Sequence, residues 1–254
     1  MKLNYKKYGA GQPLIILHGF MGSLDNWHTL ATRFGENFQV FTLDQRNHGK
    51  SPHTEAHSIP LMVADLHAFI QSHNLENVSI IGHSMGGKVA MAFALQYPNL
   101  VSKIIVVDIA PRKYKPGHDD VFEAIFAIDL KSINSRKEAE TAMTPLMPDF
   151  GTRQFLLKNL DRLEDGSYQW KMNLPVLHAY YDEITQEVNN NTPFSKPTLV
   201  IKGGNSRYIS EQDKIDFLNL FPIYQFIEIP NAGHWVHAEQ PNLFYEAVIT
   251  FLNQ

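Results

Sequence analysis

One serine stands in a pattern that is typical of a nucleophile. Ser84 is the centre of GHSMG, a G-x-S-x-G motif that follows the apolar run NVSIIGH and precedes a stretch with helical spacing. A sharp strand-to-helix turn would project its hydroxyl from the carboxyl edge of a sheet, and Gly82 and Gly86 would let the backbones approach. The helix would aim its positive N-terminal end at an oxyanion. We expect Ser84 to attack an acyl carbonyl; the alternative is an exposed serine in a glycine-rich turn.

A histidine near the C-terminus is the expected general base. His234 lies in NAGHWVHAEQP, directly after the last strand-like run, and an imidazole there can take the serine proton. His237 is the rival base, although it lies nearer the start of the closing helix PNLFYEAVITFLNQ. With Ser84 and His234 in these roles, the sequence predicts nucleophilic catalysis through an acyl-enzyme, without a cofactor.

Two backbone amides are expected to hold the oxyanion of such a reaction. LHGF closes an earlier strand, so its loop can supply the N–H of Phe20, and the residue after the nucleophile supplies the N–H of Met85. His18 and His83 flank these positions. We expect both histidines to shape the loops by hydrogen bonding rather than to react.

The acid that should orient His234 has two candidates. KGGNS offers Ser206, whose hydroxyl can accept a hydrogen bond from imidazole but carries no charge to stabilise an imidazolium. Asp108 ends the run SKIIVVD, and in the usual strand order that strand lies between the strand of Ser84 and the strand before KGGNS. We expect Asp108 to be the acid and Ser206 a helper near it. The alternative for Asp108 is a helix N-cap or an ion pair with Arg112.

The elements that must position these residues alternate between strands and helices. Continuous apolar runs indicate strands of a sheet covered on both faces, and the helical stretches between them favour parallel strands. After about residue 111 the strand rhythm gives way to segments that look helical. We therefore expect an α/β core at 1–111 and 196–254, with an all-helical cap inserted at 112–195. The expected strands are 13–19, 38–44, 77–84, 102–108, 197–204 and 224–230, and the clearest helices are 60–73 and 86–97.

Composition and charge narrow the class of protein. The 254 residues are 44% hydrophobic, and 22 Lys and Arg against 26 Asp and Glu give a formal charge of −4, too small to favour nucleic acid or an anionic membrane. There is no cysteine, so thiolate chemistry is excluded and a cytoplasmic location is expected. We expect no signal peptide and no membrane insertion, because the apolar runs are strand-sized. HTEAH lacks the order of a zinc motif, so its His53 and His57 predict no metal.

Four motifs, in this order, resemble those of the α/β-hydrolase family: LHGF, DQRNHGKS, GHSMGG and NAGHWVHAEQP. The similarity runs nearly the full length, and GGNS and AGHWVHAEQP are most similar to the YbfF-like bacterial esterases. The resemblance implies a cap-bearing hydrolase of carboxylic esters, with acyl-CoA thioesters as further substrates. It supports Asp108, because some hydrolases with this layout carry their acid after that earlier strand. It also implies that the turn DQRNHGKS is structural, with Asp44 and Arg46 paired to brace it.

The substrate and the partners are less well defined by the sequence. Arg112 and Lys113 stand where the cap departs and could meet the phosphates of a CoA thioester; the alternative is a solvated basic surface. A carbon-carbon bond hydrolase would use the same reactive residues under a different cap, and a non-catalytic relative would bind a ligand and signal through cap movement. We expect a small-molecule ester or thioester as the partner, while the oligomeric state stays open.

Overall fold

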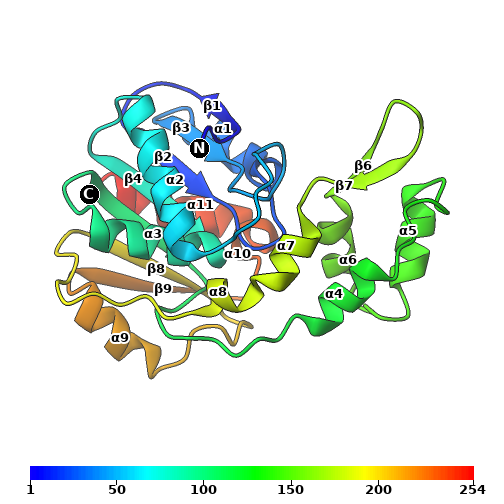
Figure 1. Cartoon of the computed structure of the whole chain (residues 1–254). Helices are drawn as coiled ribbons and strands as arrows, with labels where there is room; N and C mark the ends of the chain where they lie inside the picture. The colour runs from blue at the N-terminus through cyan, green and yellow to red at the C-terminus, as the bar shows by residue number, and fades with distance from the viewer.

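The computed structural model describes residues 1–254, and its centre is a seven-stranded sheet in the order β1-β3-β2-β4-β5-β8-β9 (Figure 1). Neighbouring strands are parallel except for β1, which pairs antiparallel with β3. β5 lies between β4 and β8, as the sequence predicts, so the residues that follow these three strands meet at one edge of the sheet. The strands are β1 (Tyr5–Tyr8), β2 (Pro13–Leu17), β3 (Gln39–Leu43), β4 (Val78–His83), β5 (Val101–Val107), β8 (Thr198–Gly203) and β9 (Tyr224–Ile229).

Helices cover both faces of this sheet, which explains why its strands are apolar throughout. Alternate side chains enter two cores: Ile80 and Val106 pack into one, while Ile81 and Val107 pack into the other. Helices α2, α3 and α9 complete the first core, and α1, α10 and α11 complete the second. These helices are α1 (His28–Phe34, preceded by the 3-10 turn η1, Leu24–Trp27), α2 (Ile59–Ser72), α3 (Met85–Gln96), α9 (Asp213–Leu220), α10 (Val236–Glu239) and α11 (Pro241–Leu252). None of the helices combines the length and the apolar character needed to cross a bilayer.

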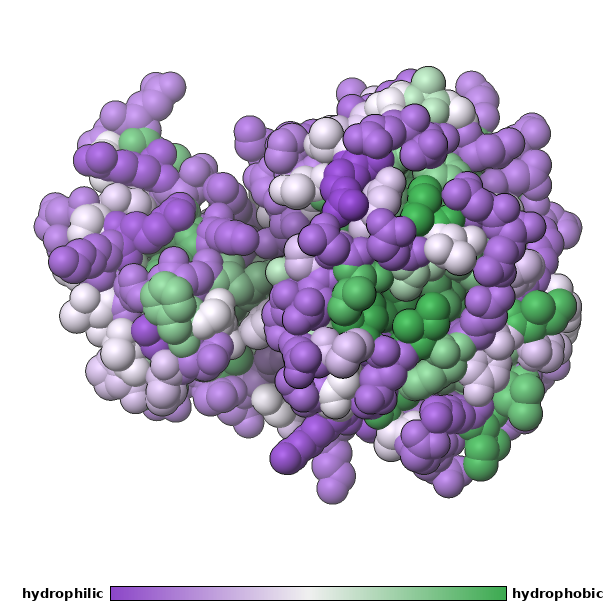
Figure 2. Space-filling model, turned by 180° about the vertical axis from the view of Figure 1, so that it is seen from behind, coloured by the Kyte–Doolittle hydropathy of each residue, from purple (hydrophilic) through white to green (hydrophobic).

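The chain between β5 and β8 adds no strand to the sheet and builds most of a third hydrophobic core. Helices α4, α5 and α6 stand beside the sheet, whereas α7 and α8 run back along it (Figure 1). Seen from behind, the part of this segment that lies beside the sheet forms a smaller lobe, and a hollow separates this lobe from the rest of the molecule (Figure 2). The helices of this segment are α4 (Asp119–Phe126), α5 (Arg136–Met143), α6 (Phe150–Leu157), α7 (Leu174–Ala179) and α8 (Tyr181–Thr185).

The prediction of an all-helical cap is wrong, because β6 (Leu160–Arg162) and β7 (Tyr168–Trp170) form an antiparallel hairpin. Gly166 takes φ +87° in its turn, and the Asp165 side chain accepts the backbone N–H of Ser167 at 2.9 Å. An Asp-Gly pair is a hairpin signal, but strands of three residues are too short for an alternating pattern to stand out. The short edge strand β1 is likewise absent from the sequence prediction.

A buried lysine ties both ends of the cap to the helix that follows the serine. Lys88 of α3 is 1% exposed. Its ammonium donates to the carbonyl of Arg112, where the cap leaves the core, and to those of Thr185 and Gln186, where it returns. Because three acceptors from two distant segments share one donor group, Lys88 fixes the base of the cap relative to α3.

Candidate active site

The turn at Ser84 is as sharp as the sequence predicts. Ser84 lies between β4 and α3 with φ 52° and ψ −118°, a conformation that a side chain rarely adopts. A Cβ on Gly82 would lie 2.2 Å from the carbonyl oxygen of Gly86, and a Cβ on Gly86 would lie 2.5 Å from that of Leu17. Both glycines are therefore required by the close approach of β4, α3 and β2, and the turn projects Ser84 from the carboxyl edge of the sheet.

A carboxylate from the neighbouring strand contacts the predicted base. Asp108 follows β5 and is fully buried, and its Oδ2 lies 2.7 Å from Nδ1 of His234 in the loop after β9. The backbone N–H of Gly203, at the end of β8, donates to Oδ1 of the same carboxylate at 3.0 Å. Asp108 has φ 51°, so the chain turns sharply here too. The sheet order thus brings the side chain of Asp108 to the imidazole, as the sequence predicts.

Ser206 contacts the carboxylate and not the imidazole. Its hydroxyl donates to Oδ2 of Asp108 at 2.5 Å, and it accepts the backbone N–H of Tyr208 at 3.2 Å. Both alternatives for Asp108 are wrong: α4 begins only at Asp119, and Arg112 pairs instead with Asp213 at 2.8 Å.

The imidazole of His234 is held on several sides. Tyr208 stacks on it with ring centroids 3.8 Å apart and planes 16° apart. Nε2 of His83 donates to the backbone carbonyl of His234 at 2.8 Å, which confirms that His83 shapes a loop by hydrogen bonding. The Tyr114 hydroxyl donates to the carbonyl of Tyr208 at 2.6 Å. Sequence reasoning missed both tyrosines, because a side chain that stacks on a ring from a distant loop leaves no periodic signal.

The loop after β2 presents the first of the two proposed oxyanion donors. Neither the backbone N–H of Phe20 nor that of Met85 donates to the loops or side chains around it. The backbone N–H of Met21 donates to Nε2 of His48 at 3.2 Å, and the backbone carbonyl of Met21 accepts a hydrogen bond from Nδ2 of Asn159 at 2.7 Å. These two hydrogen bonds fix the loop. Nδ1 of His18 contacts the carbonyl of Gly19 at 2.8 Å, in agreement with the expected structural role of that histidine.

The predicted pair between Asp44 and Arg46 is wrong. Arg46 donates to Asp65 of α2 at 2.6 Å. Asp44 instead accepts the backbone N–H groups of Leu24 at 2.8 Å and Lys50 at 2.9 Å. These backbone donors and the side-chain amide of Asn4, which donates at 2.7 Å, satisfy the Asp44 carboxylate without a cation. The turn is still structural, but its two charged residues brace different neighbours.

The basic residues at the cap boundary lie away from the site. Neither Arg112 nor Lys113 lines the cavity that contains Ser84. The guanidinium of Arg112 lies over the ring of Tyr114 at 3.9 Å and forms an ion pair with Asp213. Its charge therefore already has partners within the protein. In HTEAH, the exposed His53 contacts the carbonyl of Lys171, whereas His57 is fully buried.

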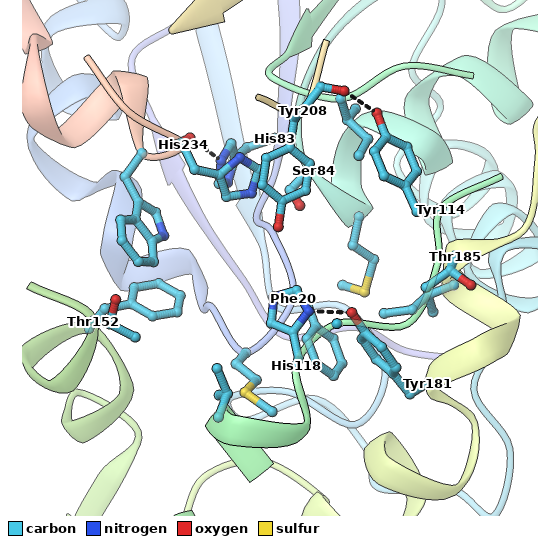
Figure 3. A pocket seen from close by; sticks show the side chains of 18 of the residues that line it. Phe20, His83, Ser84, Tyr114, His118, Thr152, Tyr181, Thr185, Tyr208 and His234 are labelled. Carbon is cyan, nitrogen blue, oxygen red and sulfur yellow. Dashed lines mark hydrogen bonds between the residues drawn. The ribbon is translucent and has the colours of Figure 1, made fainter. Parts of the chain in front are cut away.

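Ser84 and His234 line one cavity of about 310 Å³ between the sheet and the cap (Figure 3). Its walls are mostly apolar and include Phe20, Ile109 and Phe155. Figure 3 shows His118 and Tyr181, hydrogen bonded to each other, at the end opposite His234. Sequence reasoning missed these two cap residues as well, since which helical side chains face a cavity depends on how the cap packs. The arrangement can hold a largely apolar acyl compound next to a serine hydroxyl.

Four histidines around this site are buried in a way that opposes protonation. Burial is the main cause that lowers the pKa values of His48 and His83 well below the ordinary value. It lowers the pKa values of His57 and His237 to about 3. Neither ring nitrogen of His57 has a hydrogen-bond partner. All four are uncharged in the folded protein at neutral pH.

We expect the free energy of unfolding to fall as the pH drops below about 6.5, where histidines of the unfolded chain take up protons that the folded protein cannot. His57→Leu removes one such proton, so between about pH 5 and pH 6 the slope of unfolding free energy against pH should decrease by about 1 kcal/mol per pH unit. Urea denaturation of both proteins at several pH values measures this slope. An unchanged slope would contradict the assignment of His57 as a neutral buried group.

A sharp serine turn and a carboxylate-bound histidine at the edge of a mostly parallel sheet are the features of an α/β hydrolase. The chain belongs to that family, since the model of the alpha/beta hydrolase fold matches residues 12–241. The fold class and the resemblance expected from the motifs are thereby confirmed.

Individual relatives are similar over nearly the whole chain. Esterase YbfF of Escherichia coli (strain K12) is 36% identical over 259 residues, which cover 100% of both chains. An sn-1-specific diacylglycerol lipase of Danio rerio is 37% identical over 253 residues, covering 96% of this chain and 79% of the lipase. Among solved structures, a marine microorganism esterase has a TM-score of 0.96 and 43% identity, and the match covers 98% of this chain and 99% of that one.

Proposed function

We propose that this protein is a carboxylic ester hydrolase in which Ser84 is the nucleophile, His234 the general base and Asp108 the acid that orients the base. One observation carries the proposal: Nδ1 of His234 lies 2.7 Å from the buried carboxylate of Asp108, while His234 and Ser84 line the same cavity. The relatives named as esterases and as a lipase support esters as the substrates.

In the proposed reaction, Ser84 Oγ adds to the acyl carbonyl as Nε2 of His234 takes its proton, and the N–H groups of Phe20 and Met85 hold the oxyanion. The tetrahedral intermediate collapses, the alkoxide leaves with the proton from His234, and an acyl-serine remains. Water then gives a proton to His234 as it attacks the acyl group, and the second tetrahedral intermediate collapses as His234 returns this proton to Ser84 Oγ, which releases the free acid. Asp108 stabilises the imidazolium in both halves. No cofactor takes part in these steps.

Ser206 acts in this proposal on the acid and not on the base. Its hydroxyl and the Gly203 N–H bind different oxygens of Asp108, so together they fix the plane of the carboxylate. A hydroxyl that donates to Asp108 cannot replace its charge. We therefore infer that Asp108 supplies the electrostatic stabilisation and that Ser206 keeps it aligned.

Carboxylic esters are the substrates that fit the site best. An acyl-CoA thioester could react by the same steps, but Arg112 and Lys113 do not line the cavity and cannot meet its phosphates there. No feature of the cavity favours carbon-carbon bond cleavage or ligand binding without turnover. We propose that residues 112–195 act as the cap that sets the substrate range, and that the cysteine-free protein works in the cytoplasm.

A fluorophosphonate probe tests the proposal directly, because it phosphonylates only an activated serine. We expect the wild type to be labelled and to cleave members of a panel of short esters, while Ser84→Ala is not labelled. Equal labelling of Ser84→Ala, or an unlabelled wild type that cleaves no ester, would refute the function.

A further inference from the structure

The cavity has one polar pair that the proposed reaction does not use. His118, just before α4, and Tyr181, at the start of α8, come from opposite ends of the cap. Nδ1 of His118 is hydrogen bonded to the Tyr181 hydroxyl, and both residues line the cavity (Figure 3). The ring of Phe20 packs edge-on against His118, with centroids 6.1 Å apart. The pair is therefore fixed, and it lies opposite His234.

The direction of this hydrogen bond follows from its surroundings. Burial raises the pKa of Tyr181, so its phenol keeps its proton at neutral pH. Burial is the main cause that lowers the pKa of His118, which is therefore neutral and has one N–H. Nδ1 of His118 is the only hydrogen-bond partner of the Tyr181 hydroxyl, so the hydroxyl donates its proton to Nδ1. The single N–H of His118 is then on Nε2.

Nε2 of His118 has no hydrogen-bond partner within the protein, and His118 lines the cavity. The ring of Phe20 packs against His118 and against Phe122, and neither phenyl ring offers an acceptor. A donor facing a largely apolar cavity is costly unless a bound molecule satisfies it. A site with such a donor also discriminates against a substrate that lacks the matching oxygen.

We propose that His118, oriented by Tyr181, recognises a second oxygen of the substrate, a hydroxyl, ether or carbonyl oxygen separate from the ester that Ser84 attacks. The proposal rests on the proposed function and names its substrate class: esters with an acceptor oxygen in the acyl or alcohol part, rather than plain alkyl esters. His118 is a specificity residue and Tyr181 its positioning residue.

Pairs of esters that differ only by a hydroxyl in place of a methyl group test this proposal. On the alcohol side the pair is hydroxyethyl butanoate and propyl butanoate, and on the acyl side it is methyl β-hydroxybutyrate and methyl isovalerate. For each ester, kcat/KM is divided by its rate of hydrolysis in alkali, which removes differences in intrinsic reactivity. We expect the wild type to prefer the hydroxyl ester of at least one pair about tenfold, the effect of one hydrogen bond.

Three variants separate recognition from cap structure. His118→Phe should reduce the preference to about one, and Tyr181→Phe, which leaves Nδ1 without its donor, should reduce it about threefold. The matched control is His178→Phe, because His178 contacts the same Phe122 at 4.6 Å but does not line the cavity. This control should keep the wild-type preference.

The outcomes distinguish this inference from the proposed function. A wild type that cleaves both members of each pair without preferring the hydroxyl, or a preference that survives in His118→Phe, overturns the role of His118 and leaves the hydrolase intact. A wild type that cleaves none of these esters overturns this inference, and one that is also not labelled by the fluorophosphonate overturns the proposed function as well.

Discussion

Replacing His234 by alanine is expected to lower kcat for ester hydrolysis by about 10⁶, as removal of the base does in triads that act as a unit. Its Nδ1 is bound to Asp108, so Nε2 is the nitrogen that can accept the Ser84 proton. His83 cannot take over, because it is buried and its Nε2 donates to the His234 carbonyl. Steady-state kinetics gives the loss in kcat, and circular dichroism shows whether the variant is folded.

His237→Phe is the matched control for the assignment of the base. His237 is 5% exposed, and it stacks on Trp27 with centroids 4.1 Å apart and planes 8° apart, outside the cavity. Phenylalanine can keep this stacking, so kcat should change by less than about tenfold. The opposite result would be a folded His237→Phe protein without activity and a His234→Ala protein that stays active. That result would mean that the base is assigned to the wrong histidine.

Asp108→Asn is expected to lower kcat by about 10⁴, as neutralising the acid does in a Ser-His-Asp triad. The amide has nearly the same shape as the carboxylate, but it carries no charge to stabilise the imidazolium and does not enforce the tautomer with the proton on Nδ1. Since the carboxylate acts mainly in the transition state, kcat should fall while KM changes little. A lower kcat with an unchanged KM would indicate lost catalysis, whereas a raised KM would indicate a damaged substrate cavity.

The substitution Ser206→Ala tests how Asp108 and Ser206 contribute to the orientation of His234. It removes one donor to Asp108 but leaves the Gly203 N–H on the other oxygen, so kcat should fall only about tenfold. In Asp108→Asn, further loss of the Ser206 hydroxyl should have little additional effect, because it acts through the carboxylate. If Ser206→Ala is the more damaging change and Asp108→Asn is nearly harmless, the assignment of Asp108 as the acid is wrong.

Much of the site could be predicted because its residues follow strands. Ser84 and His234 stand in local patterns, and Asp108 could be placed from the expected order of the parallel strands, which the sheet confirms. The partners of charged side chains were harder to predict: Arg46 bonds to Asp65 and not to Asp44. Ion pairs form between groups that folding brings together, and residues close in sequence are only one of several choices.

The sequence by itself determined where the candidate reactive residues stand and which fold holds them: a serine at a turn that only glycines permit, a histidine after the last strand, and an alternation of strands and helices that requires a covered parallel sheet. Such features are local, because they depend on backbone sterics and on the period of apolar residues. Only the tertiary structure decided that Ser206 bonds to Asp108 rather than to His234, that Tyr208 stacks on the imidazole, and which cap side chains face the cavity. These depend on contacts between distant segments, whose packing is determined by the whole chain.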